Sequence, residues 1–331
     1  MKKTVILSGM RPTGPLHIGH LFGALANWRR LQNEGAECYF MIADCHALST
    51  EYSSPGNMKV FAEEVALDFI STGLDPEKST IFVQSEVPAH TELHTIFSMF
   101  VPISWLERNP VYKEQLEELK EKDLHMYGFL GYPVLQAADI LIYKANAVPI
   151  GKDQEPHLEL TREIARRFNF LYGEIFPEPA ALLTETPKLL GTDGRKMSKS
   201  YNNCIYLKDP PEEIRKKASA MFTDPLRIYK KDPGHPDTCP VFSYHALFAP
   251  ADAAGIEAEC RAAGIGCTDC KKDLGEEIVR FLQPIRERRA ALEADRKGLW
   301  KILAAGARKA RAVASVTLEE TRKALRMDYE H

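Results

Sequence analysis

The stretch that decides the fold is residues 4–20, which read TVILSGMRPTGPLHIGH. Residues 4–8 are a short apolar run that predicts a buried strand, and the run ends at Gly9. A loop rich in glycine and proline follows. Apolar residues then recur at helical spacing over residues 21–31, which predicts a helix that begins near Ile18. Strand, loop and helix in this order are typical of the first unit of an α/β fold.

Further strand-like runs alternate with helical stretches in the first half of the chain. This alternation predicts a parallel sheet that is covered by helices on both faces. Ligands bind beyond the carboxyl ends of the strands in such sheets, so we expect a site in the loops after Leu7, Ala43 and Ile150. The predicted strands are residues 4–8, 38–43, 80–83 and 147–150, and the predicted helices are residues 61–70 and about 155–168.

The second half of the chain has a different pattern, because the strand signal fades beyond about residue 205. Residues 210–221, 276–292 and 299–325 are predicted to be helical. We therefore expect two domains. Residues 1–205 form a Rossmann-like parallel-sheet domain with a charged helical insertion around 105–126, and residues 206–331 form an α-helical domain.

The composition is that of a soluble globular protein, with 44% hydrophobic and 27% charged residues. No apolar run approaches the ~20 residues of a membrane span, and the start of the chain does not resemble a signal peptide. These features predict a cytoplasmic protein. The net charge of −3 excludes a global basic field. Residues 281–331 carry 12 Lys/Arg against 7 Asp/Glu, a local excess of five, which charge alone explains best as a solvated helix face.

The loop after the first strand has the features of an anion site. His17 and His20 lie three residues apart, so they share one side of the first helical turn and can donate hydrogen bonds to phosphate oxygens. Gly19 between them allows a nucleotide to approach closely. A histidine pair alone is more often structural. The preceding Gly-x-x-Pro-Thr-Gly favours phosphate binding.

A second glycine-punctuated loop, residues 191–200, reads GTDGRKMSKS. It carries three cations within five residues: Arg195, Lys196 and Lys199. One interpretation is a solvated basic turn. The other is a mobile loop whose ammonium groups neutralise the charge of departing pyrophosphate, which is a large catalytic effect where it occurs.

Together the two loops resemble the HIGH and KMSKS signatures of class I aminoacyl-tRNA synthetases. Residues 17–20 and 196–200 match these signatures in full and in the family's order. The resemblance implies that His17 and His20 contact the ATP phosphates, that Lys196 and Lys199 stabilise pyrophosphate, and that Mg²⁺ bridges phosphate oxygens. The catalytic residues it implies are His17, His20, Lys196 and Lys199, and the ATP-binding set is Arg11, Thr13, Gly19, His20, Asp153, Lys196, Met197, Ser198 and Lys199.

The amino acid to be activated is suggested by residues 132–141, YPVLQAADIL, which resemble the substrate-reading helix of the tryptophanyl and tyrosyl subgroup. A buried carboxylate at Asp139 can accept a hydrogen bond from an indole N–H or a phenol O–H. The alternative is a helix-surface aspartate, but the apolar neighbours of Asp139 favour burial.

Two further stretches resemble the tryptophanyl pattern, residues 44–46 (DCH) and residues 148–162 (VPIGKDQEPHLELTR). The resemblance implies that tryptophan is the substrate. Tyrosine remains an alternative substrate, because Gln136 resembles the tyrosyl pattern and because Arg11 and Lys152 depart from the tryptophanyl pattern. The implied tryptophan-binding residues are Leu7, His46, Tyr132, Gln136, Asp139, Ile140, Val148, Ile150 and Gln154.

Four late cysteines form a Cys-x20-Cys-x6-Cys-x2-Cys pattern. Their thiolates can hold an iron–sulfur cluster or a zinc ion, and spacing alone does not separate the two. The pattern resembles that of the bacterial tryptophanyl enzymes with a [4Fe–4S] cluster in the C-terminal domain, which implies the cluster. The residues are Cys239, Cys260, Cys267 and Cys270.

The resemblance also implies the activity and the partners: tryptophan–tRNA ligation with ATP, binding of tryptophan tRNA, and a homodimer to whose interface residues 105–126 contribute. The helical domain would read the anticodon, with Arg308, Lys309 and Arg311 on the tRNA backbone. Two other classes of protein are a nucleotidyltransferase that does not act on tRNA and a non-charging paralogue that binds nucleic acid or a partner.

Overall fold

The computed structural model describes residues 3–118, 124–183 and 189–329. Its contacts divide the chain into two compact units. Unit 1 comprises residues 1–14, 23–185 and 292–331, and unit 2 comprises residues 15–22 and 186–291. This division differs from the predicted boundary near residue 205. Two segments cross that boundary, because residues 15–22 pack with the later part of the chain and the last helix packs with the first part.

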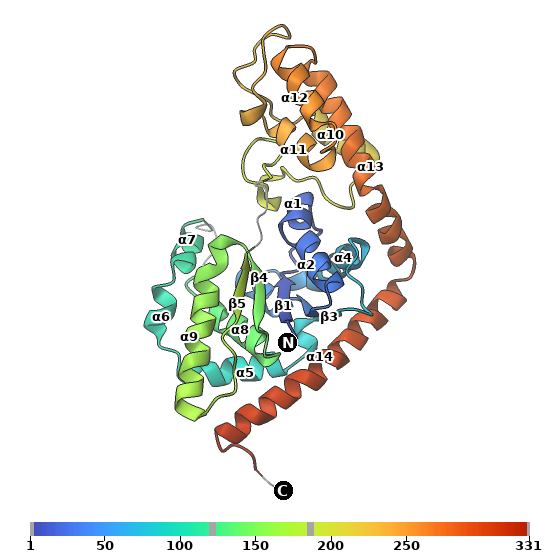
Figure 1. The fold of residues 1–331 in the computed structure, drawn as a ribbon. Coiled ribbons are helices and arrows are strands. Elements are labelled where there is room, and N and C mark those ends of the chain that lie inside the picture. The colour runs from blue at the N-terminus through green and yellow to red at the C-terminus, as the bar shows by residue number, and fades with distance from the viewer. Residues whose placement is uncertain (1–2, 119–123, 184–188, 330–331) are drawn as a thin grey trace. The chain divides into compact units, whose positions relative to one another are not determined.

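Unit 1 is built on a sheet of five parallel strands in the order β3-β2-β1-β4-β5 (Figure 1). The α/β fold and the four predicted strands are confirmed. The sequence analysis missed the partly exposed edge strand β5. The neighbours of β1 lie on its two opposite sides, so the winding of the chain reverses at this strand, which is where ligands bind in such sheets. The strands are β1 (Val5–Met10), β2 (Glu37–Ile42), β3 (Thr80–Val83), β4 (Ala147–Ile150) and β5 (Ala180–Leu183).

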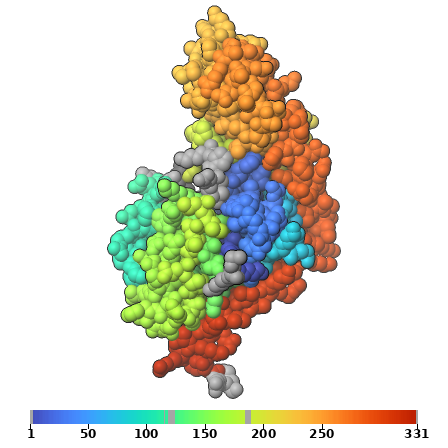
Figure 2. All heavy atoms as spheres, viewed as in Figure 1, coloured from blue at the N-terminus to red at the C-terminus, as the bar shows by residue number. Residues whose placement is uncertain are grey.

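Helices surround this sheet, and the predicted helices 61–70 and 155–168 are confirmed as α4 and α9. The predicted insertion is helical in α6 and α7, and its residues 119–123 lie outside the described residues. In the space-filling view, green α9, the blue N-terminal segments and red α14 all appear on the surface of unit 1 (Figure 2). The helices of unit 1 are α2 (Ala26–Asn33), α3 (Asp44–Glu51), α4 (Met58–Ser71), α5 (Ala89–Ser98), α6 (Ile103–Glu107), α7 (Pro110–Glu118), α8 (Tyr127–Ile142), α9 (Glu155–Tyr172) and α14 (Arg296–Ala324).

Large aromatic side chains fix α2 and α4 on one part of the sheet. The Trp28 ring stacks on Phe40 of β2 with a centroid distance of 5.0 Å, and it meets the Phe69 ring of α4 edge-on at 5.4 Å. All three side chains are buried. Burial of such rings stabilises the fold by area and by ring geometry together.

The long helix α14 packs on β3, which corrects the assignment of residues 299–325 to the second domain. Gly306 makes this contact possible, because a Cβ atom there would lie 1.9 Å from the Ile81 carbonyl oxygen. Ion pairs of Arg296 with Glu63 and of Arg322 with Glu92 hold the helix along its length.

Unit 2 is helical apart from isolated β-bridges, as the sequence predicts for most of it. The predicted helices 210–221 and 276–292 are confirmed as α10 and part of α13. None of the helices in the described part of the chain is long and apolar enough to cross a membrane. The helices of this unit are α1 (Ile18–His20), α10 (Pro211–Ser219), α11 (Pro240–Phe248), α12 (Ala253–Arg261) and α13 (Cys267–Ala294), which ends just beyond it.

We predict that Gly306→Ala lowers the free energy of unfolding of unit 1 by about 1–3 kcal/mol, because the methyl group forces α14 away from β3. Gly128→Ala is the matched control. Gly128 also lies in a helix of unit 1, and its Cβ would meet nothing within 4 Å. Urea unfolding followed by circular dichroism measures both. Equal stability of the two variants would contradict the close approach.

Candidate active site

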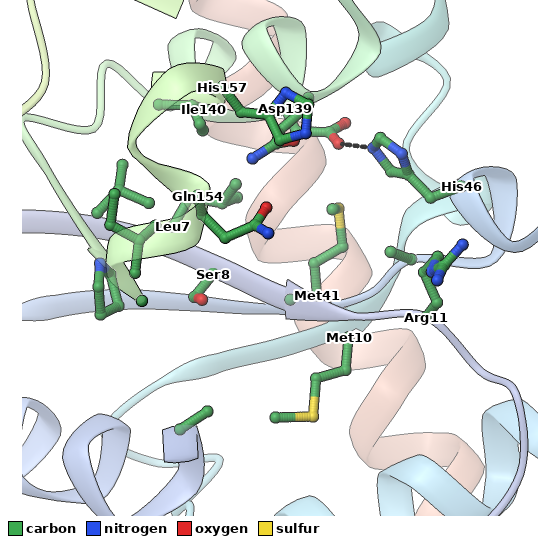
Figure 3. Close-up of a pocket in the computed structure, with 18 of the residues that line it drawn as sticks. Leu7, Ser8, Met10, Arg11, Met41, His46, Asp139, Ile140, Gln154 and His157 are labelled. Carbon is green, nitrogen blue, oxygen red and sulfur yellow. Dashed lines mark hydrogen bonds and ion pairs between the residues drawn. The ribbon is translucent and has the colours of Figure 1, made fainter. Parts of the chain in front are cut away.

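A cavity of about 400 Å³ lies in unit 1 at the carboxyl ends of β1 and β4. This is the position that the reversal of winding at β1 predicts. Its walls come from β1, β2, β4, α3, α8 and the start of α9, with Met41 and Ile140 among the apolar residues (Figure 3). All nine predicted tryptophan-binding residues line this one cavity: Leu7, His46, Tyr132, Gln136, Asp139, Ile140, Val148, Ile150 and Gln154.

Asp139 is the charged group at the inner end of this cavity, and its side chain is 1% exposed. His46 Nε2 lies 2.7 Å from Asp139 Oδ2 (Figure 3), and His90 Nδ1 lies 2.6 Å from Oδ1. Burial alone would raise the pKa of Asp139. The hydrogen bonds from His46 and His90 outweigh burial and lower that pKa to about 2. The carboxylate is therefore ionised at neutral pH and can only accept hydrogen bonds.

A second buried network orients Tyr132 at the cavity wall. The Asn109 side-chain oxygen accepts from the Val111 N–H, so its Nδ2 donates to His157 Nδ1 at 3.1 Å. Burial lowers the pKa of His157 to about 4, and the neutral ring then carries its proton on Nε2. That Nε2 donates to the Tyr132 hydroxyl oxygen at 2.9 Å. The network fixes the position of the tyrosine oxygen.

Sequence reasoning missed the side chains behind Asp139, which are Gln84, His90 and Tyr143. They come from a short 3-10 turn, from α5 and from the end of α8. None belongs to a motif. The only signal in the sequence was a glutamine and a histidine just after the predicted strand 80–83, where functional side chains collect in such folds.

The predicted nucleotide-binding residues of unit 1 lie at the rim. Arg11 lines the cavity and is exposed, and its guanidinium lies 3.5 Å from the Thr50 hydroxyl. Thr13 is in the loop that follows β1. Asp153 is exposed in a 3-10 turn, where its carboxylate accepts from the Gln154 side chain at 2.9 Å.

In unit 2 the structure brings the two signature loops together. The Ile18 N–H donates to the Ile205 carbonyl at 3.0 Å, and the Leu207 N–H donates to the Leu16 carbonyl at 3.0 Å. These bonds tie the first loop to the segment that follows the lysine-bearing loop. A Cβ atom on Gly19 would lie 2.9 Å from the His17 ring and 3.4 Å from the sulfur of Met197, so only glycine fits without displacement.

The two histidines of the first signature loop, His17 and His20, are kept neutral. Burial and the nearby Lys199 charge lower the pKa of His17 to about 4, and burial followed by His17 and Lys199 lowers that of His20. The His17 N–H donates to His20 Nδ1 at 3.2 Å, which leaves the proton of the neutral His20 ring on Nε2. His17 Nδ1 is buried and has no hydrogen-bond partner among the described residues. Neutral imidazole N–H groups here can donate to a phosphate.

Asn203 shapes the lysine-bearing loop and was not predicted. Its side chain is buried, donates to the Lys196 carbonyl at 3.1 Å and to Asp193 at 2.8 Å, and accepts from the Ser198 N–H at 2.8 Å. Arg195 pairs with Asp193, with a shortest distance of 2.6 Å. One of the three predicted cations is thus engaged within the loop itself.

The four cysteines of the late pattern also lie in unit 2, all partly buried and none in a disulfide. Burial and, to a smaller extent, the charges of the other three thiols raise the pKa of Cys270 to about 12, so the four interact electrostatically. Arg227 Nη1 lies 3.9 Å from Cys267 Sγ. Within the described ranges, no three His, Cys, Asp or Glu side chains are arranged so that they could hold a metal ion. The residues are Cys239, Cys260, Cys267 and Cys270.

Comparison with known proteins places this geometry in a family. The family model described as "tRNA synthetases class I (W and Y)" matches residues 1–283. The chain belongs to the class I tRNA synthetases of this type. A relative from Thermotoga maritima named tryptophan–tRNA ligase is 52% identical over 324 residues, which cover 97% of this chain and 99% of the relative. A second, from Aquifex aeolicus and of the same name, is 46% identical over 97% of this chain and 99% of its own.

Solved structures of this family of synthetases agree with the fold. The tryptophanyl-tRNA synthetase of Campylobacter jejuni, complexed with ADP and tryptophan, has a TM-score of 0.88 at 33% identity and covers 97% of this chain and 99% of its own. A tyrosyl-tRNA synthetase from Archaeoglobus fulgidus has a TM-score of 0.68 at 22% identity over 87% of this chain and 91% of its own, which shows the shared fold alone.

We predict that His17 titrates in the folded synthetase with a pKa of about 4. Lys199→Met should raise this pKa part of the way toward 6.5, because the like charge is removed while burial, the larger cause, remains. NMR titration of the labelled histidine ring measures both values. Lys208→Met, a change of an exposed lysine of unit 2, is the control and should leave the midpoint in place. If the pKa of His17 is the same in Lys199→Met and in the wild type, the Lys199 charge does not act on His17. The two signature loops would then not lie close together.

Proposed function

We propose that this protein is a tryptophan–tRNA ligase, which activates L-tryptophan with ATP and transfers it to tryptophan tRNA. One observation carries the proposal. Nine residues chosen from separate stretches of sequence line a single cavity with a buried, ionised Asp139 at its inner end. The relatives with 40–52% identity, which bear this name, support it.

Tryptophan fits the polar groups of the cavity better than tyrosine does. An indole N–H only donates, and the Asp139 carboxylate only accepts. A phenol hydroxyl both donates and accepts, so a tyrosine site usually offers it two polar partners. Here the neighbour of Asp139 at the cavity wall, His46, already directs Nε2 at the carboxylate. The apolar walls suit a bicyclic ring.

Activation is an in-line attack by the tryptophan carboxylate on the α-phosphate of ATP, with pyrophosphate as the leaving group. The substrate carboxylate is already ionised, so no residue has to act as a general base. The neutral rings of His17 and His20 donate to phosphate oxygens, and Lys196 and Lys199 neutralise the charge that develops on pyrophosphate. Positioning and electrostatics therefore supply the catalysis. Mg²⁺ would enter with ATP and would help to neutralise the charge of the phosphates.

A terminal ribose hydroxyl of the tRNA then attacks the carbonyl carbon of the adenylate, so the tryptophanyl group passes to the tRNA as an ester and AMP leaves. We assign the helical unit 2 to the anticodon, whose unpaired bases are held by stacking and edge hydrogen bonds. Arg311, which was expected on the tRNA backbone, contacts Glu86 in unit 1. A non-charging paralogue is the second candidate. Paralogues of this kind typically lose a histidine or a lysine of the two signatures. This chain keeps His17, His20, Lys196 and Lys199.

ATP–pyrophosphate exchange with each amino acid in turn tests the function. We expect exchange with tryptophan and not with tyrosine, followed by charging of tryptophan tRNA. Exchange without charging would support the paralogue instead. Exchange with tyrosine alone would show that the cavity binds tyrosine and not tryptophan.

We predict that Lys199→Ala slows this exchange by about 100-fold or more, since one preorganised charge on the leaving group is lost. Tryptophan affinity should change little, because Lys199 is not among the residues that line the cavity. Single-turnover kinetics with equilibrium binding of tryptophan separates the two effects. Lys208→Ala, an exposed lysine of the same unit, is the control. Unchanged kinetics of Lys199→Ala would remove its role.

We further propose that the four cysteines hold a [4Fe–4S] cluster, with zinc as the alternative. The chemistry of the donor set fits, because four mutually interacting thiols lie beside a guanidinium, Arg227, that can balance thiolate charge. A zinc ion would need all four sulfurs about 2.3 Å from one point. A cubane takes each thiolate on a different iron and so accepts a wider arrangement. The cluster would be structural.

Anaerobically purified protein should be brown and contain iron and inorganic sulfide in equal amounts. Cys260→Ser should lose the colour and most of the iron. Cys45→Ser is the matched control, since Cys45 is also partly buried but lies in unit 1. A colourless preparation with stoichiometric zinc would overturn the cluster.

We also propose that the enzyme is a cytoplasmic homodimer. Apolar side chains lie exposed on unit 1 around the end of α5, the start of α6 and the end of α9. Exposed apolar groups of this size are typical of association surfaces. They adjoin the predicted interface region 105–126. The side chains are Met99, Ile103, Phe170 and Leu171.

A further inference from the structure

The Asp139 carboxylate meets hydrogen-bond donors on two different sides. On the cavity side, His46 Nε2 lies 2.7 Å from Oδ2, and both side chains line the cavity (Figure 3). On the protein side, His90 Nδ1 lies 2.6 Å from Oδ1, and Gln84 Nε2 lies 2.8 and 3.0 Å from the two oxygens. Gln84 and His90 are 1% and 0% exposed and are not among the described lining residues.

The protein-side groups are joined by a chain of hydrogen bonds. An ionised carboxylate only accepts, so His90 Nδ1 donates to it. The other ring nitrogen of His90, Nε2, lies 2.7 Å from the Tyr143 hydroxyl oxygen. The Gln84 side-chain oxygen accepts from the His46 N–H at 3.4 Å, which directs its amide nitrogen to Asp139.

Tyr143 itself has little freedom to move. Its ring stacks on Tyr39 with a centroid distance of 4.3 Å and meets Phe82 edge-on at 5.9 Å. The side chain is buried, and burial together with the Asp139 charge raises the pKa of its hydroxyl, so the proton stays on the oxygen. Tyr143 is therefore rigid and stays protonated, and its hydroxyl holds the His90 ring through Nε2.

This arrangement restricts rotation of the Asp139 carboxylate. A carboxylate held only from the cavity side could turn about its terminal bond and point an oxygen away from a substrate. A donor on Oδ1 that is itself fixed by a rigid tyrosine prevents this turn. Recognition groups bind tightly when their supporting shell fixes them in advance.

We infer that His90, held by Tyr143, is the positioning residue that presents Asp139 Oδ2 to the indole N–H of tryptophan. The inference rests on the proposed function, in which Asp139 reads that N–H. It adds a specificity-determining pair that lies behind the cavity and touches no substrate atom.

The test compares tryptophan with β-(3-benzothienyl)alanine, in which sulfur replaces the indole N–H and the shape is kept. His90→Leu should lower kcat/KM for tryptophan in ATP–pyrophosphate exchange by about 10- to 100-fold, the factor for one hydrogen bond to a charged group. The value for the sulfur analogue should change much less, and the KM for ATP should stay the same. A merely structural defect would lower kcat/KM by the same factor for both substrates, and this result would overturn the inference.

Two further variants sharpen the result. His90→Asn keeps a donor near the position of Nδ1 and should restore most of the activity with tryptophan. Tyr143→Phe removes one oxygen atom, and we expect a loss of about 3- to 10-fold with tryptophan only. If His90→Leu fails to fold, the ratio of the two substrates in Tyr143→Phe decides by the same criterion. An equal loss for both substrates there would refute the role of the pair.

Asp139→Asn separates the inference from the proposed function. Should the substitution lower kcat/KM by the same factor for both substrates, Asp139 does not read the N–H, and the proposed role of Asp139 in the cavity fails. Asp139→Asn could lower kcat/KM for tryptophan alone, while His90→Leu and Tyr143→Phe lower it for neither substrate or for both equally. In that case only the role of His90 and Tyr143 fails.

Discussion

A buried, ionised carboxylate imposes the strictest condition on unit 1. Removal of a charge from water costs several kcal/mol unless donors surround it. At Asp139 the donors come from α3, a 3-10 turn after β3, and α5, while the carboxylate itself stands on α8. Four elements must therefore reach their final positions together. The same condition that makes the charge tolerable also gives the cavity a fixed acceptor.

Unit 2 presents hydrogen-bond donors and positive charge, whereas the cavity of unit 1 presents a negative charge. The proposed function requires this unit to attract ATP, a highly charged anion. The two histidines of its first signature loop, His17 and His20, are neutral because they are buried and lie near a lysine, so they contribute directional N–H groups rather than charge. The formal positive charge resides on the lysine-bearing loop, whose shape depends on Asn203. Direction and charge are thus supplied by different side chains.

The sequence was informative where a local pattern exists. Apolar runs predicted β1–β4, and residues 44–46, 132–141 and 148–162 contain all but one of the nine predicted residues that line the cavity. The edge strand β5 was missed because its Ala-Ala-Leu-Leu run lacks β-branched residues and is only partly buried. The partners of Asp139 were missed because His90 and Gln84 lie 49 and 55 residues away. The boundary near residue 205 was misplaced because a linear pattern does not reveal that α14 returns to the sheet.

The return of α14 has a consequence for how the chain is made. Ribosomal synthesis proceeds from the first residue, and domains generally fold as they emerge. Here the helix that covers β3 is among the last parts to leave the ribosome, after all of unit 2. Until α14 has been synthesised, the apolar surface that it covers on the nascent sheet remains exposed. A premature stop codon near residue 290 would leave it in that condition permanently, and such a fragment should be a ready substrate for chaperones and proteases.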